Sequence, residues 1–380
     1  MAQVFDCMVV GLGANGSSTL YHLSGTGKKI IGIDRFKPPH TFGSSHGESR
    51  IIRQAYYEDP IYVPLLRAAY KEWEGMERTS GKKLFQKTGG LMLGYEDTAV
   101  VQGSRLSADT HHIPYEYLDA SALRQRFPAF LPPDGTVGVL EKEAGILFPE
   151  ECIRTFLDQA ALKGAAIHYN EPVLKLTPTQ RSIEVRTSKG HYSVASLVLS
   201  AGAWTNQLLP ELKLPLTVKR QPLFWFANGN AQHRRRFLPG QMPVYIWEYT
   251  AGKMFYGFPD LGTGIKIAPH HRGRTIDPDQ LTQGVSREEI EEMEAITREY
   301  LDMSPVFQTS AVCMYTNTPD ENFIIDRHPA FPNIIIASPC SGHGFKFSSL
   351  TGRILGDMAL GNDTGFDLSP FSISRQNLNV

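Results

Sequence analysis

A glycine-rich turn near the start of the chain constrains the fold most strongly. Residues 11–16 read Gly-Leu-Gly-Ala-Asn-Gly directly after an apolar run, and Asp34 follows a second apolar run about twenty residues later. Gly11 permits a tight turn, Gly13 lets the backbone approach a pyrophosphate, and Gly16 allows close packing of the following helix. The helix N-terminus attracts phosphate, and the carboxylate of Asp34 can accept hydrogen bonds from ribose hydroxyls. The pattern predicts a parallel βαβ unit that binds FAD or NAD, against the alternative of a glycine turn with no ligand.

Length and composition favour a soluble protein with a small ligand. Its 380 residues suffice for two domains, and a hydrophobic fraction of 41% supports a substantial core. The 38 basic and 39 acidic side chains nearly balance, so no charge excess points to nucleic acid or an anionic membrane. Four scattered cysteines, with no secretory leader and no apolar run of spanning length, predict a reduced, cytoplasmic protein. Because neither CxxC nor HExxH occurs, no metal site is expected.

Segments typical of a nucleotide-binding sheet lie at both ends of the chain, and a different region separates them. Helical spacing marks residues 61–77 and 152–162, and residues 183–194 have the pattern of a strand pair. From residue 215 to 315 the segments become aromatic and strand-rich around one helix near residues 287–300. We therefore expect a discontinuous cofactor domain of residues 1–84, 150–214 and 316–380, and a substrate domain of residues 85–149 and 215–315.

A second cofactor-binding segment is expected between residues 313 and 347. It begins with Cys-Met-Tyr in a strand-like run, passes through an acidic turn, and ends with Ser-Gly-His-Gly-Phe-Lys before an apolar helical pattern. Side chains alternate along a strand, so Cys313 and Tyr315 point to the same face. The small residues of the loop permit close approach of a ligand, and Lys346 adds a cation. We expect both ends of the chain to serve one ligand.

Together these motifs resemble the family of monomeric sarcosine oxidases and N-methyltryptophan oxidases, which are amine oxidases that carry covalent FAD. The resemblance runs nearly end to end. It implies an α/β fold of the glycine/D-amino acid oxidase type, with a doubly wound, Rossmann-like FAD-binding domain and a smaller antiparallel β-sheet substrate domain over the flavin. It rests on residues 11–16, 38–53, 256–259, 313–315, 320–326 and 341–347.

The resemblance assigns residues to the cofactor. It implies that the sulfur of Cys313 is joined to the flavin 8α-methyl group, whereas the residues alone favour a small buried hydrophobic side chain. It places Arg50 over the flavin ring and Lys346 near the pyrimidine edge. The expected cofactor contacts are Gly11, Gly13, Gly16, Asp34, Arg35, Ser45, Arg50, Val173, Gly202, Cys313, Gly342, Gly344 and Lys346.

The substrate site follows from the same resemblance. Arg53 and Lys346 are expected to hold a carboxylate, which suits a planar guanidinium fork and an ammonium group. Lys266 matches the lysine that activates oxygen, on the side of the flavin opposite the carboxylate site. The residues expected in catalysis are Lys266, His270, Arg50, Tyr315 and Tyr256.

Plainer interpretations compete with these assignments. Arg50 and Arg53 have the spacing of a solvated helix face, Lys346 can be a surface lysine, and Tyr315 can be a core tyrosine.

Several positions depart from the family pattern. Pro269 replaces the aromatic residue that usually precedes His270, and Cys340 stands at a usually apolar position. His271 is expected to be a solvated neighbour of the pocket. The substrate can therefore differ in size from sarcosine.

The sequence thus predicts a monomeric oxidase of N-methyl or other secondary amino acids. Sarcosine, oxygen and water would yield glycine, formaldehyde and hydrogen peroxide, with no nucleic acid or membrane partner. The alternatives are an oxidase of a bulkier N-methyl or cyclic secondary amino acid, a flavin dehydrogenase that passes electrons to a partner, and a flavin-binding sensor with weak turnover.

Overall fold

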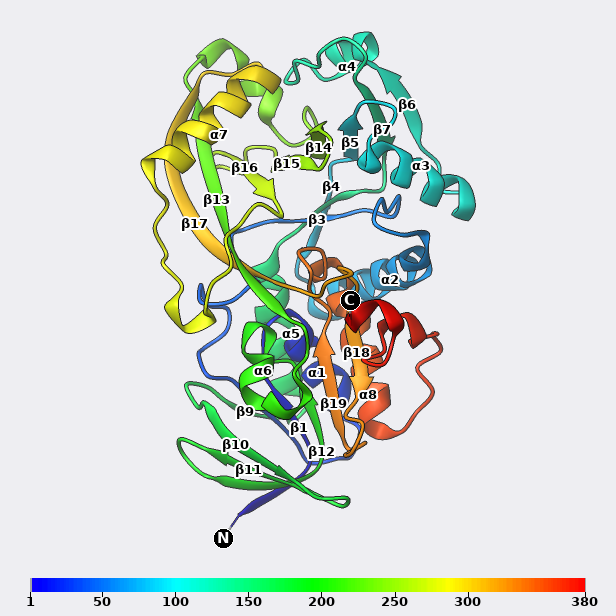
Figure 1. Cartoon of the computed structure of the whole chain (residues 1–380), viewed down its shortest axis with the longest axis vertical. Helices are drawn as coiled ribbons and strands as arrows, with labels where there is room; N and C mark the ends of the chain where they lie inside the picture. The colour runs from blue at the N-terminus through cyan, green and yellow to red at the C-terminus, as the bar shows by residue number, and fades with distance from the viewer. Residues whose placement is uncertain (1, 380) are drawn as a thin grey trace.

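The computed structural model describes residues 2–379, and the strands of this part of the chain form three sheets. Figure 1 shows the sheet that contains β1 in the lower half of the molecule and the sheet that contains β14 to β16 in the upper half. The small third sheet lies between them, near β3 and β4. No helix within residues 2–379 has both the length and the apolar character needed to cross a bilayer.

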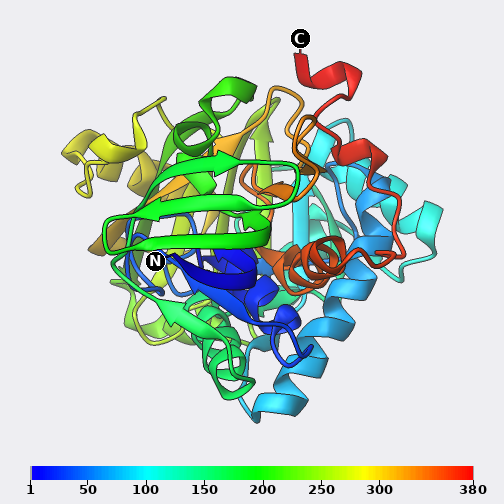
Figure 2. The same ribbon diagram turned by 90° about the horizontal axis from the view of Figure 1, so that it is seen from below.

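The first sheet has a parallel centre. In it β1 pairs with β2 and β12, β2 pairs with β9, and β12 pairs with β19. Antiparallel β10 and β11 extend the sheet beyond β12, as the green strands of Figure 2 show, and β18 pairs antiparallel with β19. The strands are β1 (Gln3–Val10), β2 (Ile30–Ile33), β9 (Ala166–His168), β10 (Val173–Pro178), β11 (Ile183–Thr187), β12 (His191–Leu199), β18 (Ile324–Arg327) and β19 (Ile334–Ser338).

The second sheet is mostly antiparallel. Its long strands β13 and β17 pair along their whole length and run from the upper sheet toward the first sheet in Figure 1. Its strand order is β17 (Pro305–Asn317), β13 (Thr217–Asn228), β16 (Ile265–His270), β15 (Lys253–Phe258), β14 (Val244–Thr250), β5 (Gly90–Gly94), β7 (Val137–Glu141) and β6 (Glu116–Asp119). The third sheet joins β3 (Arg50–Ile52), β8 (Gly145–Leu147) and β4 (Phe85–Lys87).

The helices begin and end where the local sequence directs. The N-terminus of α7 has a capping box, in which Ser286 accepts from the Glu289 amide and Glu289 accepts in return. Gly81 and Gly361, with φ of 67° and 76°, end α2 and α8 in the left-handed conformation. The helices are α1 (Ala14–Leu23), α2 (Val63–Ser80), α3 (Ala99–His111), α4 (Ala120–Arg126), α5 (Pro149–Leu162), α6 (Thr205–Leu208), α7 (Arg287–Tyr300) and α8 (Ser348–Leu360).

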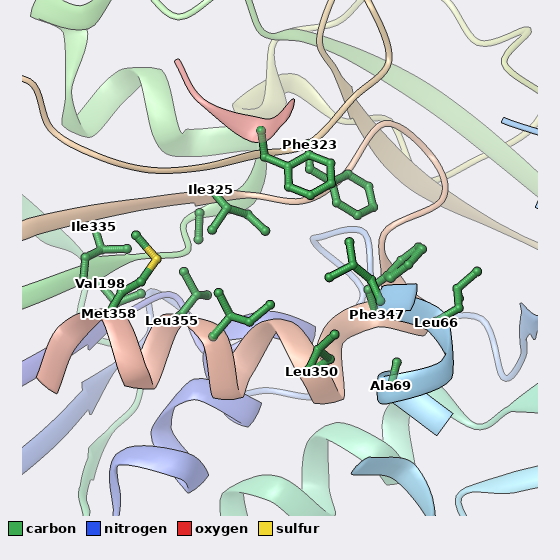
Figure 3. Close-up of a cluster of buried hydrophobic side chains, with 14 of the residues drawn as sticks. Leu66, Ala69, Val198, Phe323, Ile325, Ile335, Phe347, Leu350, Leu355 and Met358 are labelled. Atoms are coloured by element: carbon green, nitrogen blue, oxygen red, sulfur yellow. The ribbon is translucent and has the colours of Figure 1, made fainter. Parts of the chain in front are cut away.

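The core of the first sheet follows the alternation of side chains along β1. Cys7 and Val9 belong to the cluster that α1, α2, α5 and α8 cover, whereas Met8 and Val10 belong to the cluster on the other face. Figure 3 shows Leu350 and other side chains of α8 packed between the strands and α2. Burial on both faces explains why residues 7–10 of β1 form a continuous apolar run.

The predicted elements agree with the structure, with shifted ends. The helices expected at 61–77 and 152–162 are Val63–Ser80 and Pro149–Leu162, and the helix expected at 287–300 has those bounds. The predicted strand pair is β11 and β12, with Ile183 opposite Val194. The predicted α/β fold is confirmed. The division into two discontinuous domains stays a prediction.

Candidate active site

A long cavity opens at the carboxyl ends of the parallel strands of the first sheet. The turns that follow β1, β2 and β12 line it, which is where ligands bind in open α/β sheets. The empty space within it, including the open solvent at its mouth, is about 1140 Å³. The predicted cofactor contacts that line it are Gly11, Gly13, Asp34, Arg35, Ser45, Val173 and Gly202.

The three glycines of the turn lie in different steric environments, which explains why each position suits glycine. Gly11 has φ of 85°, and a Cβ there would lie 2.4 Å from the carbonyl oxygen of Ser200. A Cβ on Gly16 would lie 1.8 Å from the carbonyl oxygen of Gly11, so α1 packs against the turn only with glycine. A Cβ on Gly13 would meet only the Oγ of Ser45, at 3.8 Å. The side of Gly13 that faces the cavity is therefore open for a phosphate.

Asp34 is fixed at the edge of this cavity by backbone amides. Its Oδ2 accepts from the amide of Leu12 at 2.6 Å, and its Oδ1 accepts from the amide of Phe36 at 2.7 Å. Burial raises the pKa of the Asp34 carboxyl to about 6. A carboxylate has about four acceptor positions, so two remain for ribose hydroxyls.

A loop that follows the second sheet contacts the rim of the same cavity. Asp279, in the turn Pro278–Gln280 after β16, accepts from Arg35 Nη1 at 2.7 Å, Trp204 Nε1 at 2.9 Å and Gln207 Nε2 at 3.0 Å. All three donors line the cavity. The acid thus ties three pieces of the cavity rim together.

A second cavity adjoins the first at the N-terminus of α1. Asn15 and Thr316 line this space, and their side-chain oxygens are buried without a partner within residues 2–379. The bare Gly13 turn and the two adjoining cavities fit one elongated ligand such as FAD. The two cavities share Ala14, Asn15, Ser44, Ser45 and Cys340. The predicted residues that line the second cavity are Ser45, Arg50, Arg53, Tyr256, His270, Cys313, Tyr315, Gly342, Gly344 and Lys346.

Cys313 lies on β17 among basic groups. Its sulfur is 3.3 Å from His46 Nε2 and 3.5 Å from Arg50 Nη2. Burial raises the pKa of the thiol, but His46 and Arg50 more than offset this effect and lower it to about 7. The other three cysteines have raised pKa values. Cys313 is therefore the cysteine that ionises most readily.

Arg53 is buried and paired. Only 1% of the residue is exposed, so the surface interpretation is wrong. Its Nη2 donates to Glu58 Oε2 at 2.6 Å, and its Nη1 donates to the carbonyl of Ala55 at 3.1 Å. Burial raises the pKa of the Glu58 carboxyl, but Arg53 more than offsets this effect and lowers it. The ion pair lies at the wall of the second cavity.

Lys346 is also a buried cation, with 7% exposure. Its ammonium donates to the carbonyl of His343 at 2.8 Å and lies 3.5 Å from the hydroxyl of Tyr56. Burial, followed by the charge of Arg53, lowers the pKa of Lys346 to about 7. A bound anion would favour the charged form of this lysine.

Three aromatic side chains face one another across the second cavity. The hydroxyl of Tyr315 lies 3.4 Å from His270 Nδ1, and the rings of Tyr256 and Tyr315 each lie 5.8 Å from the His270 ring. Burial lowers the pKa of His270 well below its usual range, so the imidazole is neutral. These rings give the cavity polar edges without a strong base.

Lys266 lies behind the segment that carries Arg50. Its ammonium donates to the carbonyls of Gly47 and Ser49 at 2.6 and 2.9 Å, and it faces the ring of Phe258 at 4.7 Å. Burial and the charge of Arg50 lower the pKa of Lys266 well below its usual range. Unlike His270 on the same strand, it does not line the second cavity.

One expectation about the site is wrong. His271 was expected to be solvated, but only 18% of its side chain is exposed. Its ring packs 5.5 Å from the Tyr315 ring and 4.0 Å from the His270 ring. A φ of 56° turns it inward at the end of β16, and a single-residue backbone turn of this kind leaves no periodic trace.

Several groups that contact the expected site residues were not predicted from the sequence. Tyr56 and Glu58 follow Arg53 closely, and His46 and His343 lie inside motifs already noted. Their proximity in sequence was the available signal. Asp279 carried no such signal because it lies far along the chain from Arg35 and Trp204.

Comparison with known proteins agrees with this geometry. A family model described as FAD dependent oxidoreductase matches residues 6–358. The chain belongs to this family. The FAD-dependent oxidoreductase is 39% identical over 380 residues to the monomeric sarcosine oxidase of Streptomyces avermitilis, covering 99% of this chain and 98% of that protein. It is 34% identical over 382 residues to the N-methyl-L-tryptophan oxidase of Salmonella heidelberg, and the match covers 98% of this chain and 99% of that protein.

A solved structure shares the fold. NikD, described as an unusual amino acid oxidase essential for nikkomycin biosynthesis, matches with a TM-score of 0.85 and 22% identity over 98% of each chain. The resemblance to sarcosine and N-methyltryptophan oxidases and the expected FAD are thereby confirmed.

Proposed function

We propose that this FAD-dependent oxidoreductase oxidises N-methyl or other secondary amino acids, with sarcosine as the first substrate. The observation that carries the proposal is the pair of buried cations, Arg53 and Lys346, in a cavity that also holds Cys313. Two cations in an enclosed space suit a carboxylate, because a planar guanidinium binds it with parallel donors. Relatives named sarcosine oxidase and N-methyl-L-tryptophan oxidase, both acting on N-methyl amino acids, support this substrate class.

The cofactor would lie across both cavities. Gly11, Gly13 and the N-terminus of α1 would hold the pyrophosphate, and Asp34 would hold the ribose. FAD supplies the acceptor for a hydride equivalent from the carbon attached to the substrate nitrogen, and it returns electrons to oxygen. Cys313 would tether it through a thioether, because its thiol is the one that basic neighbours favour as thiolate.

The chain's own residues would bind, orient and protect the substrate. Arg53 and Lys346 would hold the carboxylate, and the rings of Tyr256, His270 and Tyr315 would exclude water and set the pose. None of these groups is a strong base, so the substrate would bind as the free amine. Oxidation of the amine would give an imine, and water would hydrolyse this imine without a catalytic group of the protein.

Lys266, a further buried cation near the second cavity, would assist the reaction with oxygen. A fixed positive charge in a dry site stabilises negative charge that develops on oxygen. We further propose that the protein acts as a cytoplasmic monomer, as the name of its relative in Streptomyces avermitilis suggests for oligomeric state.

The deciding experiment combines acid precipitation of the purified protein with anaerobic addition of sarcosine. The proposal expects yellow flavin in the pellet, bleaching of the native protein by sarcosine, and one peroxide for each sarcosine in air. Flavin that remains oxidised with sarcosine and with bulkier N-methyl amino acids would overturn the proposed reaction. Bleaching without peroxide would replace the oxidase with a dehydrogenase.

A further inference from the structure

A buried hydrogen-bond chain runs from Lys346 to a backbone carbonyl. The His343 Nε2 lies 3.0 Å from the carbonyl oxygen of Glu321. A carbonyl only accepts, so Nε2 carries the proton and donates. Burial lowers the pKa of His343 to about 4, so the ring is neutral and its Nδ1 is an acceptor. The hydroxyl of Tyr56, 2.6 Å from that Nδ1, must therefore donate to it.

The direction of this chain determines what Tyr56 offers to Lys346. Because its proton is committed to His343, the hydroxyl of Tyr56 presents only lone pairs to the ammonium, 3.5 Å away. The ammonium also lies 5.1 Å from the centre of the Tyr56 ring, over its face. Both contacts favour the charged lysine, and Tyr56 itself is fully buried.

We propose that Tyr56, oriented by His343, is a positioning residue that keeps Lys346 charged and aimed at the substrate carboxylate. The inference rests on the proposed function, since it needs a carboxylate at Lys346. It extends that function, because neither Tyr56 nor His343 was expected to take part. The groups that face the ammonium are Arg53, Glu58, Tyr56, His343 and His270.

The effect of Tyr56 on carboxylate binding should depend on pH in a definite direction. The pKa of Lys346 is lowered to about 7, so the charged form is lost as pH rises through that range. Removal of an acceptor that stabilises the ammonium lowers this pKa further. Carboxylate binding should therefore weaken at a lower pH in Tyr56→Phe than in the unaltered protein.

The test measures binding of methoxyacetate to the holoenzyme by the change in flavin absorption, from pH 6 to pH 9. This probe has the shape of sarcosine but no amine, so no amine of the ligand titrates between pH 6 and pH 9. Tyr56→Phe is expected to weaken binding about threefold to tenfold at pH 8 and less at pH 6. Tyr62→Phe is the matched control, because Tyr62 packs 5.2 Å from the Tyr56 ring while its hydroxyl donates to Asn322.

Two changes at His343 test the orientation without touching Tyr56. His343→Asn keeps an acceptor near the position of Nδ1 and should keep the pH profile. His343→Gln places its amide near Nε2 and should shift the profile as Tyr56→Phe does. Coincident profiles for Tyr56→Phe and Tyr62→Phe, or equal shifts for the two His343 variants, would overturn the inference.

The role of Tyr56 and the proposed function can fail separately. If sarcosine bleaches the unaltered protein but the variant profiles coincide, only the role of Tyr56 is wrong. If the unaltered protein bleaches neither with sarcosine nor with bulkier N-methyl amino acids and does not bind methoxyacetate, the proposed function fails and the role of Tyr56 fails with it.

Discussion

Arg53 and Glu58 form an ion pair in which Nη2 of the arginine lies 2.6 Å from Oε2 of the glutamate. The arginine is almost fully buried, and the glutamate lines the second cavity. A protein carboxylate therefore occupies the guanidinium that a substrate carboxylate would use. Substrate binding must exchange one carboxylate for the other or share the fork between them.

Removal of the Glu58 charge should tighten carboxylate binding. In Glu58→Gln the guanidinium loses its competitor, so the dissociation constant of methoxyacetate should fall about threefold to tenfold. The free energy of unfolding should fall by about 1–3 kcal/mol because a buried charge loses its partner. Titration of flavin absorption and chemical denaturation measure the two effects. Glu48→Gln is the control, since Glu48 accepts from Trp225 and Thr263 and from no arginine; equal tightening there would contradict the exchange.

Cys313→Ser should abolish flavin retention in acid-precipitated protein, whereas Cys340→Ser should preserve it. Both cysteines line the second cavity, but basic neighbours lower the pKa of Cys313 to about 7 and burial raises that of Cys340 to about 11. A thiolate is the nucleophile in thioether formation. Absorbance of the washed pellet gives the result. Flavin retained in Cys313→Ser, or lost in Cys340→Ser, would reassign the tether.

Lys266→Met should slow the reaction of reduced protein with oxygen by about a hundredfold while reduction by substrate changes little. In the unaltered protein, reoxidation should slow as pH rises, because burial lowers the pKa of Lys266 and the charged form is lost. Stopped-flow traces of the two half-reactions separate the steps. Lys346→Met serves as the lysine control and should weaken substrate binding instead. A Lys266→Met protein with both half-reactions slowed equally would remove this lysine from oxygen chemistry.

Asp279→Asn should loosen the cofactor without altering the substrate site. Asp279 accepts from three side chains on the rim of the first cavity. Since its side chain is 40% exposed, we expect only about threefold weaker FAD binding in a Cys313→Ser background. Fluorescence titration of apoprotein with FAD measures the constant. Asp367→Asn alters an acid that caps the turn at Ser369 and should bind FAD normally. Unchanged FAD affinity in both variants would show that the hydrogen bonds of Asp279 do not help to retain the cofactor.

The local sequence was enough to predict those elements whose conformation depends on interactions within one short segment. The roles of Gly11 and Gly16 follow from backbone sterics within a few residues, and the capping box at Ser286 states where α7 begins. A continuous apolar run identified the end of β1, and helical spacing identified α5, for the same reason. The family motifs then predicted part of the lining of both cavities, including Cys313 and Lys346, whereas the predicted Gly16 and Lys266 line neither.

Long-range pairing was outside the reach of such patterns. The partners of Arg53, Lys346 and Asp279 are set by where strands and loops meet after folding, and a hydrogen bond carries no periodic signature in the chain. The burial that lowers the pKa of Lys346 to about 7, and the basic neighbours that lower the pKa of Cys313 to about 7, exist only once the chain has folded around the cavities. The chain thus encodes its local elements directly, whereas charge states and partners in the site arise from packing between segments far apart in sequence.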